Sequence, residues 1–466
     1  MRLGPPRRSL SKRSRTVLAL LAGALLVLPA CGQFEGVHDD FVAQGGENEG
    51  LGGSEGGSAD GGATGGDGTE SSGDGGGSDD ASGGGGGGGG GGNDNGNAGN
   101  GDTTGVTADT ITIGIHAPLT GAAPLKQESF ATGKDLYWQY GNGGKPVQIH
   151  GRTVETVFAD DQYRPSTARQ VCQTMAEEQQ AFALIGAGGT DQIQACAQYA
   201  ASEDVPYLST GVTETGMGSL DTYFAASMTY RQQAPMLAAY IKNELGVTDA
   251  SKVAAVVTNT PNFDDAVEGF TGAFDGVDVF RPDKNERGSS AAGNLCTGTV
   301  KNYDVVFVLT SPTFYLEMAA ASGCRPQFAG VGVSMGLDQV ASTGCSAASS
   351  TEGARFFNPT PAFADAGEYD PDFLAAVDAA GIEADDVTWM MWGQSKVLHQ
   401  MLERAGEGLD RGAFMDAVAG QKFSTGVFPD LNYANGPFGA TQVSVLRNVC
   451  SGGGHYETDF AFVSGF

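Results

Sequence analysis

The sequence predicts an α/β protein of two doubly wound lobes, joined by a hinge of several strands and preceded by a disordered leash. Short apolar segments alternate with segments of helical periodicity, and the alternation occurs in two successive series. Segments that are apolar throughout are typical of parallel strands covered by helices on both faces. Residues 32–105 contain no lysine or arginine and cannot form a core, which predicts the leash.

The clearest part of the first series covers residues 144–190. A strand over 154–158 ends at Asp160 and Asp161, whose carboxylates can cap the following turn. Pro165 suits the first turn of a helix, and the apolar spacing that follows predicts a helix over 167–178. The apolar run 181–185 then stops at Gly186, which predicts a strand that opens into the N-terminus of another helix.

The other elements follow the same rules. The first series also contains strands at 111–117 and 207–208 and helices at 130–140 and 191–201. After a strand at 223–226, the second series consists of helices at 235–244, 264–274 and 313–321 and strands at 253–257, 277–280, 305–309 and 328–331. A strand at 352–358 returns the chain to helices at 371–380, 386–404 and 411–418. We therefore expect lobe 1 to contain residues 106–226 and 357–422, and lobe 2 residues 227–356 and 423–466.

The first thirty residues are typical of a secretory signal peptide, because six basic residues precede the apolar run 17–28. Cys31 directly follows a small residue, as in the lipobox of bacterial lipoproteins. We expect cleavage of residues 1–30 and acylation of Cys31, for example by palmitate. An ordinary signal peptide and an uncleaved anchor are the alternatives, although the apolar run is shorter than the roughly 20 residues that span a bilayer.

Residues 31–105 would form the lipidated cysteine and a Gly/Asp-rich linker. The linker includes ten consecutive glycines at 83–92, and a chain of this composition has a root-mean-square reach of roughly 50 Å. Taking the six basic residues of the signal peptide and the fourteen acidic residues of 32–105 from the total of −29 leaves −21 on the folded part. This charge excludes nucleic acid and an anionic membrane surface as expected partners.

The cysteine count is typical of an exported protein with disulfides, because six cysteines remain once Cys31 is assigned to the lipid. Order along the chain favours a pair between neighbouring helices of one lobe, and by elimination the last two cysteines form the third pair. A metal site is the competing interpretation, but no Cys-x-x-Cys or close Cys/His cluster is present. The expected pairs are Cys172–Cys196, Cys296–Cys324 and Cys345–Cys450.

Together with the order of elements, a set of short motifs resembles the type I periplasmic binding proteins, in particular the leucine-binding-protein-like proteins that serve ABC transporters of branched-chain amino acids and amides. The resemblance covers about residues 106–466 and weakens after about 353. It implies Rossmann-like lobes, no enzymatic activity, no cofactor, and a monomer that is lipid-anchored on the extracytoplasmic face of the cell membrane and delivers a small solute to permease subunits. The motifs are Gly143-Gly144 with Gly151-Arg152, Asp160-Asp161-Gln162-Tyr163-x-Pro165, and Leu184-Ile185-Gly186.

Two loops of lobe 1 are candidate ligand sites, because ligands of open α/β sheets lie beyond the carboxyl ends of the strands. The loop that contains Gly189 and the loop that begins at Ser209 each offer backbone N–H groups and a hydroxyl, which can receive a carboxylate. The resemblance implies that Thr190, Gly211 and Thr213 hold the carboxylate of the ligand. Simple capping of a helix or a turn is the alternative role of Thr190 and Ser209.

In lobe 2 the resemblance implies a site that includes Tyr230 and Phe263, whose aromatic faces suit an apolar body or a cation. The sequence departs from the amino-acid-binding pattern at two positions. Gly332 stands where an acidic residue would bind an ammonium group, and Ser311 stands where an aromatic residue is expected. An amide or a small carboxylic acid is therefore an alternative to an amino acid. Other carboxylates that could replace the missing acid are Asp264, Asp265 and Glu214.

Two other functions compete with solute delivery. The same module could sense a ligand for a separate receptor, since fold alone does not decide between the two roles. Residues 332–336 match Gly-x-Ser-x-Gly, so a serine hydrolase built on Ser334, with His399 or His455 as the base, is a remote alternative. No Walker motif is present, so the energy for transport would come from other subunits.

Overall fold

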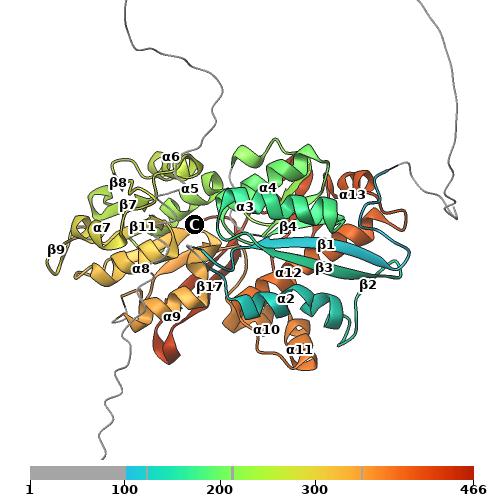
Figure 1. Ribbon diagram of the computed structural model, residues 1–466. Coiled ribbons are helices and arrows are strands. Elements are labelled where there is room, and N and C mark those ends of the chain that lie inside the picture. Colours follow the sequence, from blue (N-terminus) through green and yellow to red (C-terminus); the bar gives the residue numbers. More distant parts are fainter. Residues whose placement is uncertain (1–100, 122–123, 211–214, 348–349) are drawn as a thin grey trace, which may run out of the picture. The chain divides into compact units, whose positions relative to one another are not determined.

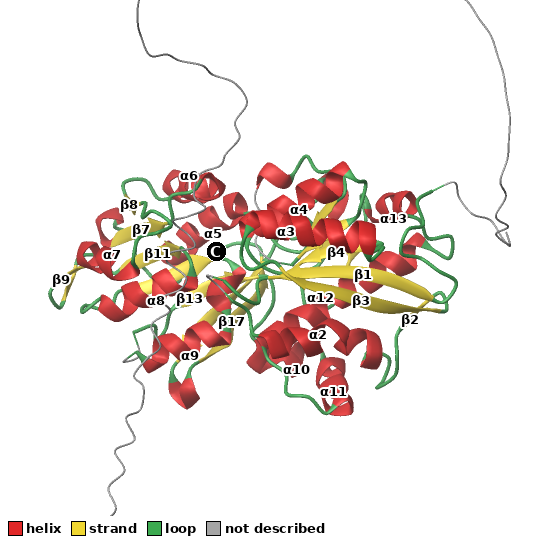
Figure 2. Ribbon diagram, viewed as in Figure 1, coloured by secondary structure: helices red, strands yellow, loops and turns green. Residues whose placement is uncertain are grey.

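The computed structural model describes residues 101–121, 124–210, 215–347 and 350–466. The predicted signal peptide, the acylation of Cys31 and the linker up to residue 100 lie outside the described residues. In the described ranges, every helix is too short or too polar to cross a membrane. Figure 2 shows helices and strands alternating along the folded part, as the sequence predicts.

The strands are β1 (Thr110–Ala117), β2 (Gln148–Ile149), β3 (Arg152–Asp160), β4 (Ala183–Gly186), β5 (Tyr207–Ser209), β6 (Tyr223–Ala225), β7 (Val253–Val257), β8 (Asp278–Phe280), β9 (Cys296–Thr297), β10 (Val300–Lys301), β11 (Val305–Leu309), β12 (Gln327–Val331), β13 (Arg355–Asn358), β14 (Lys422–Phe423), β15 (Leu431–Asn432), β16 (Val443–Val449) and β17 (His455–Val463). The α-helices are α2 (Gln127–Tyr140), α3 (Pro165–Gln173), α4 (Thr190–Ser202), α5 (Tyr230–Asn243), α6 (Asp264–Ala273), α7 (Gly288–Leu295), α8 (Pro312–Ala321), α9 (Asp338–Ser346), α10 (Ala366–Tyr369), α11 (Pro371–Ala380), α12 (Asp386–Ala405) and α13 (Arg411–Val418).

Lobe 1 is built on a six-stranded sheet with the order β2-β3-β1-β4-β5-β6. All neighbours are parallel except β2 and β3, and the register places Gly114 of β1 beside Val157 and Leu184. Helices α2 and α12 cover one face of this sheet, and α3 and α4 cover the other (Figure 1). This is the doubly wound arrangement that the sequence predicts.

Lobe 2 is built on a seven-stranded sheet with the order β17-β16-β13-β12-β11-β7-β8. The strands from β8 to β13 are parallel, whereas β16 and β17 add an antiparallel edge. All residues of β7 and β11 are buried, as expected of strands covered on both faces. Helices α5 and α6 lie on one face, and α7, α8 and α9 lie on the other (Figure 1).

Several chain segments pass between the two sheets. Lobe 1 continues into lobe 2 after β6, and the chain returns after β13 and crosses again before β16. Phe438 forms an isolated parallel bridge with Ala225, so β6 contacts the chain shortly before the last crossing. The division of the two lobes at residues 226, 356 and 422 stays a prediction.

Helix α5 begins earlier than the sequence analysis expects. We predicted a start at residue 235, but the helix begins at Tyr230, because Thr229 and Gln232 form a capping box. Pro235 lies inside the helix, and its ring packs beside α6, where Gly269 leaves room for it. The prediction was wrong here because proline was taken as the first-turn residue and the capping box was overlooked.

The six described cysteines form three disulfides: Cys172–Cys196, Cys296–Cys324 and Cys345–Cys450. These are the pairs expected from the order of cysteines along the chain. The first joins α3 to α4 in lobe 1, and the other two join segments of lobe 2. Each disulfide therefore stabilises one lobe and leaves the connection between the lobes unconstrained.

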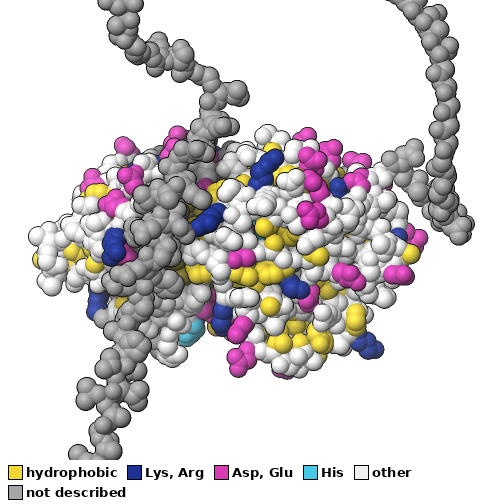
Figure 3. All heavy atoms as spheres, in the orientation of Figure 1, with side chains coloured by type: hydrophobic (Ala, Val, Ile, Leu, Met, Phe, Trp, Pro, Cys, Tyr) yellow, Lys and Arg dark blue, Asp and Glu magenta, His cyan; other side chains and the backbone are white. Residues whose placement is uncertain are grey.

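Acidic side chains are more frequent than basic ones on the face in Figure 3. Asp and Glu side chains are spread over the face in Figure 3, whereas Lys and Arg side chains are isolated. This distribution agrees with the charge of −21 calculated for residues 106–466. On the part of this face that the grey atoms leave uncovered, Lys and Arg side chains form no continuous patch.

Candidate functional site

The strand order places the candidate residues at the switch point of each sheet. In lobe 1 the order reverses between β1 and β4, and in lobe 2 it reverses between β7 and β11. Ligands of open α/β sheets bind beyond the carboxyl ends of the strands at such points. The residues at or after the carboxyl ends of β4, β5, β7 and β11 include Gly189, Thr190, Ser209, Phe263 and Ser311.

The N-terminus of α4 offers backbone N–H groups that no capping side chain occupies. Gly189 is the N-cap residue, with φ of +78°, and a Cβ there would lie 2.1 Å from Oε1 of Gln192. The positive φ favours glycine at this position, whereas the Gln192 side chain could move away from an added Cβ. Thr190 begins the helix and is 9% exposed. The first N–H groups of a helix, together with the helix dipole, favour an anionic oxygen at this position.

Two buried hydroxyls lie beside this helix terminus in the sheet. Ser209 is the last residue of β5 and pairs with Gly186 of β4, and Thr210 follows it. They are 0% and 1% exposed, and among the described residues neither hydroxyl has a hydrogen-bond partner. A buried polar group without a partner costs about 1–3 kcal/mol, so these hydroxyls favour an incoming acceptor or donor. Gly211 and Thr213, the next predicted residues, lie outside the described residues.

Asp160 shapes the loop after β1 instead of binding a ligand. Its carboxylate accepts hydrogen bonds from the N–H and the hydroxyl of Thr120 and from the N–H groups of Leu119 and Gln162. Burial alone would raise the pKa of Asp160, but these hydrogen bonds lower it overall. The carboxylate is already fully engaged, so the Asp-Asp motif belongs to the scaffold.

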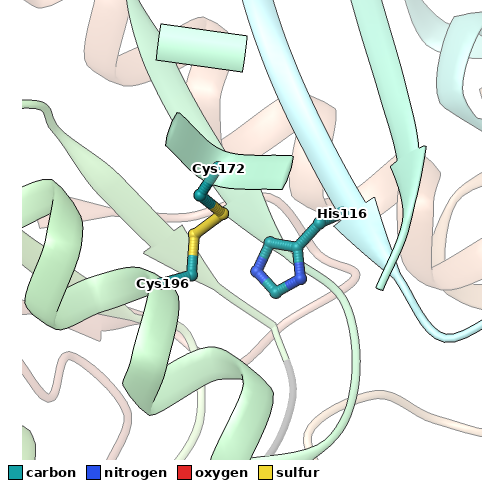
Figure 4. A group of neighbouring side chains, drawn as sticks. All are labelled: His116, Cys172 and Cys196. Atoms are coloured by element: carbon teal, nitrogen blue, oxygen red, sulfur yellow. A yellow bond between two sulfur atoms is a disulfide. The ribbon is translucent and has the colours of Figure 1, made fainter. Parts of the chain in front are cut away.

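His116 is part of a buried hydrogen-bonded chain. Its Nδ1 lies 2.8 Å from Asp161 and its Nε2 lies 2.7 Å from the hydroxyl of Tyr207, and the imidazole is fully buried. Figure 4 shows the ring beside the Cys172–Cys196 disulfide, with ligand atoms of the three residues within 4.8 Å of one another. Because both ring nitrogens and both sulfurs are bonded, this group offers a metal no free ligand in the oxidised protein.

Lobe 2 contributes an apolar wall. The rings of Tyr230 and Phe263 meet edge to face, with centroids 5.3 Å apart. Gly332 has φ of +108°, and a Cβ there would lie 3.6 Å from the Tyr230 hydroxyl and 3.9 Å from Cδ1 of Leu309. Tyr230, Leu309 and Gly332 therefore converge at the carboxyl edge of the sheet, and no side chain extends from the position where an acid would bind an ammonium group.

Ser311 has a defined structural role at the same edge. Its hydroxyl accepts a hydrogen bond of 3.3 Å from the N–H of Phe314 and so caps α8. The hydroxyl proton is still available for donation. Capping and ligand binding are therefore compatible for this residue, and its contact with a ligand stays a prediction.

Two of the three carboxylates proposed as substitutes for the missing acid, Asp264 and Asp265, are already paired with cations. Glu214 lies outside the described residues. Asp191, near the helix terminus, is paired as well. The pairs are Lys284 with Asp191 at 2.8 Å, Arg281 with Asp264 at 2.8 Å, and Arg231 with Asp265 at 3.3 Å. An ammonium group would have to compete with these side chains for a carboxylate.

The Gly-x-Ser-x-Gly segment does not form a nucleophile elbow. Ser334 lies in a short 3₁₀ helix, Val333–Gly336, and α9 begins only at Asp338. His399 bonds to the hydroxyl of Tyr137 in lobe 1, and His455 lies 3.6 Å from Glu457. In the described ranges no hydrogen bond joins either histidine to Ser334, so the hydrolase hypothesis lacks its base.

Sequence reasoning missed several residues of this region. Thr210 was overlooked beside Ser209, although its position in the same loop was a signal. The contact between the lobes that Asp191 makes with Asn262 and Lys284 could not be predicted from the sequence. These two partners lie 71 and 93 residues from Asp191 along the chain.

A family profile described as periplasmic binding protein matches residues 110–445. The chain belongs to the periplasmic binding protein family. The family and the solved structures that share its fold are solute-binding proteins and not enzymes. A search of curated protein sequences gives no match.

Solved structures show the same fold at low sequence identity. A fatty acid ABC transporter substrate-binding protein from Thermomonospora curvata is 17% identical, with a TM-score of 0.65 over 78% of this chain and 95% of that one. A solute binding protein of an ABC transporter from R. palustris, in complex with 4-hydroxybenzoate, is 18% identical, with a TM-score of 0.63 over 76% and 98% of the two chains. A leucine binding protein from Thermotoga maritima is 16% identical, with a TM-score of 0.60 over 75% and 98%.

Proposed function

We propose that this periplasmic binding protein is the extracytoplasmic solute-binding lipoprotein of an ABC importer and that it holds a small carboxylic acid between its lobes. The observation that carries the proposal is the pair of buried, unpartnered hydroxyls of Ser209 and Thr210 at the same sheet edge as the uncapped N-terminus of α4. Hydroxyls and helix N–H groups together bind a carboxylate without a formal positive charge.

The apolar wall of lobe 2 supports a solute with an aliphatic or aromatic body. Tyr230 and Phe263 present ring surface, and Leu309 and Gly332 add no charge. An ammonium group buried there without a carboxylate would cost several kcal/mol. Among the described residues, Asp264 and Asp265 already pair with arginines. We therefore favour a carboxylic acid without an ammonium group over an α-amino acid or an amide.

The solved relatives bind both kinds of solute, acids without an ammonium group and amino acids. They include a fatty acid ABC transporter substrate-binding protein, a solute binding protein in complex with 4-hydroxybenzoate and a leucine binding protein. The first two ligands are acids that lack an ammonium group, and the third is an amino acid. The residues proposed to contact the solute are Gly189, Thr190, Ser209, Gly211, Thr213, Tyr230, Phe263 and Ser311, and the structure adds Thr210 to this set.

The proposed location at the membrane is based on the N-terminal sequence. Acylation of Cys31 would anchor the chain to the outer face of the membrane, and the linker up to residue 105 would let the lobes reach a permease. Mass spectrometry of the purified protein tests this part, because a diacyl or triacyl modification at Cys31 is expected. A mature N-terminus elsewhere would contradict the anchor.

Thermal-shift measurements on the full-length protein test the solute class. The panel contains 4-hydroxybenzoate, octanoate, leucine, leucinamide and putrescine. A ligand at 100 times its Kd adds about 2.7 kcal/mol, which raises the melting temperature by about 5 °C. We expect the two acids without an ammonium group to give this shift. A shift with leucine, leucinamide or putrescine alone would refute the proposed class.

A pair of isosteric variants locates the site. Thr210→Val removes a hydroxyl at the carboxyl end of β5, and Thr222→Val removes another buried, unpartnered hydroxyl before the amino end of β6. Loss of a hydrogen bond to a charged group costs about 1.5–3 kcal/mol, so Thr210→Val should weaken binding of the acid about 10- to 100-fold. Thr222→Val should bind like the native protein, and equal losses in both variants would place the site elsewhere.

A further inference from the structure

Asp191 connects the two lobes directly beside the proposed solute site. It is the second residue of α4, next to Thr190, and its side chain is 32% exposed. The carboxylate lies 2.8 Å from Nζ of Lys284 and accepts a hydrogen bond from the side-chain amide of Asn262. Both partners belong to lobe 2, so one carboxylate of lobe 1 is bound by two loops of the other lobe.

The lobe 2 partners are held in place by their own lobe. Asn262 lies in a 3₁₀ turn, and its N–H donates a hydrogen bond to the hydroxyl of Thr260, which caps the turn. The guanidinium of Arg281 donates to the carbonyl of Thr260 at 3.2 Å. The N–H of Asn259 donates to the carbonyl of Pro282 at 2.8 Å, which fixes the loop that carries the lysine. Because these groups are already ordered, forming the contact with Asp191 requires little additional ordering.

The lobe 1 side is equally well supported. The ring of Tyr163 lies close to Gly189, where a Cβ would be 3.3 Å from it. Burial, together with the carboxylates of Asp191 and Asp161, raises the pKa of Tyr163 to about 12. The phenol therefore keeps its proton at neutral pH and adds no charge beside Asp191. The N-terminus of α4 is a firm support for the contact.

We propose that Asp191 is a positioning residue of the solute site, which holds the N-terminus of α4 against the Asn262 and Lys284 loops of lobe 2. The inference rests on the proposed function, because this arrangement also brings Thr190 toward the lobe that carries Phe263. The contact consists of protein atoms alone, so the bridged arrangement can form before solute binds. If the solute binds only this arrangement, its affinity rises in proportion to the fraction of protein molecules that are bridged.

The effect of the bridge can be bounded. The partly exposed ion pair between Asp191 and Lys284 stabilises the bridged arrangement only a little, whereas the hydrogen bond from Asn262 to the charged carboxylate stabilises it more. Together they should shift the ratio of bridged to open molecules roughly tenfold, which is about 1.4 kcal/mol. Salt should reduce this ratio, because the ion pair is partly exposed to solvent.

Hydrogen exchange of the full-length protein without added solute measures the bridge independently of the solute class. Asp191→Asn should raise the exchange of amides in residues 187–192, 258–264 and 281–285 roughly tenfold. The matched control is Asp265→Asn, which also removes a carboxylate from the second residue of a helix. Asp265 is 31% exposed and pairs with Arg231 inside lobe 2. The control should leave exchange in the three segments unchanged.

Lys284→Met provides the second variant, because it removes the cation and leaves the helix terminus intact. If the pair forms the bridge, each single variant should raise exchange, and the double variant should exchange no faster than Asp191→Asn. In 500 mM salt the difference between Lys284→Met and the native protein should become smaller. The proposal is overturned if Asp191→Asn behaves like Asp265→Asn or if the two single effects simply multiply. Neither outcome depends on the thermal-shift panel, so the bridge and the solute class can fail separately.

Discussion

Replacement of Asp386 by asparagine should make the protein more stable at pH 8 while leaving its stability near pH 4.5 almost unchanged. Asp386 begins α12, and its carboxylate accepts hydrogen bonds from the N–H of Asp338 at 2.6 Å and of Val387 at 2.9 Å. Burial raises its pKa from 3.8 to about 7, and the neighbouring carboxylates of Asp338 and Asp385 act in the same direction. The two N–H groups oppose this rise but do not cancel it.

The direction of the pH effect follows from the protons bound in each state. Between pH 4 and pH 7 the folded protein retains a proton on Asp386 that the unfolded chain has released, so the free energy of unfolding falls as the pH rises. Each pH unit of difference corresponds to about 1.4 kcal/mol, so ionisation of Asp386 lowers stability by about 4 kcal/mol at pH 8. Asparagine carries no charge and can still accept the hydrogen bond from Asp338. Its loss of the second acceptor costs about 1 kcal/mol.

Urea unfolding at pH 4.5, 6 and 8, followed by tryptophan fluorescence, tests this expectation. The three tryptophans lie in α2 and α12, so the signal reports the lobe that contains Asp386. The variant should gain about 3 kcal/mol over the native protein at pH 8 relative to pH 4.5. Asp378→Asn, an exposed change on α11, controls for the loss of one negative charge and should show no such gain. An Asp386→Asn variant with the same pH dependence as the native protein would refute the reasoning.

Two further predictions concern stability. Replacing Cys345 and Cys450 by serine should lower the free energy of unfolding by about 5 kcal/mol, and replacing Cys172 and Cys196 should lower it by about 3.5 kcal/mol. The first disulfide closes a loop of 105 residues and the second a loop of 24 residues, and a longer closed loop restricts the entropy of the unfolded chain more. Comparable losses in urea unfolding of the two variants would contradict the loop-length argument. Arg411→Met should lower the free energy of unfolding by about 2–4 kcal/mol. The guanidinium is 8% exposed, donates to the carbonyls of Phe182 and Ala181, and pairs with Asp102 at 2.6 Å. An unchanged melting temperature would show that water replaces these bonds.

The fold was predictable where burial is uniform along an element. The strands expected at 253–257 and 305–309 coincide with β7 and β11, because all residues of both are buried and apolar. The π-helical turn Thr174–Glu178 was not predictable, since its residues continue the helical pattern of α3 and only the winding changes. The start of α5 was readable from Thr229 and Gln232, but Pro235 gave the more obvious signal.

The site was predictable only at the level of loops. Glycine and hydroxyl residues after apolar strands point to Gly189, Thr190 and Ser209, because strand ends and turns have local signatures. The contact of Asp191 with Lys284 has no such signature, since it depends on how two separately folded sheets meet. The role of His116 was likewise decided by its two buried partners, which neighbouring residues in the sequence do not reveal.

The positions of the disulfides have a consequence for how the protein matures during export. If the predicted signal peptide directs export, Cys172 and Cys196 cross the membrane early and can be oxidised while most of the chain is still inside the cell. Cys345 must wait for Cys450, 105 residues later, after the chain has returned to add α12 and α13 to lobe 1. Secretion that stalls between these two cysteines therefore leaves a reactive thiol, and the redox state of Cys345 reports whether translocation has reached residue 450.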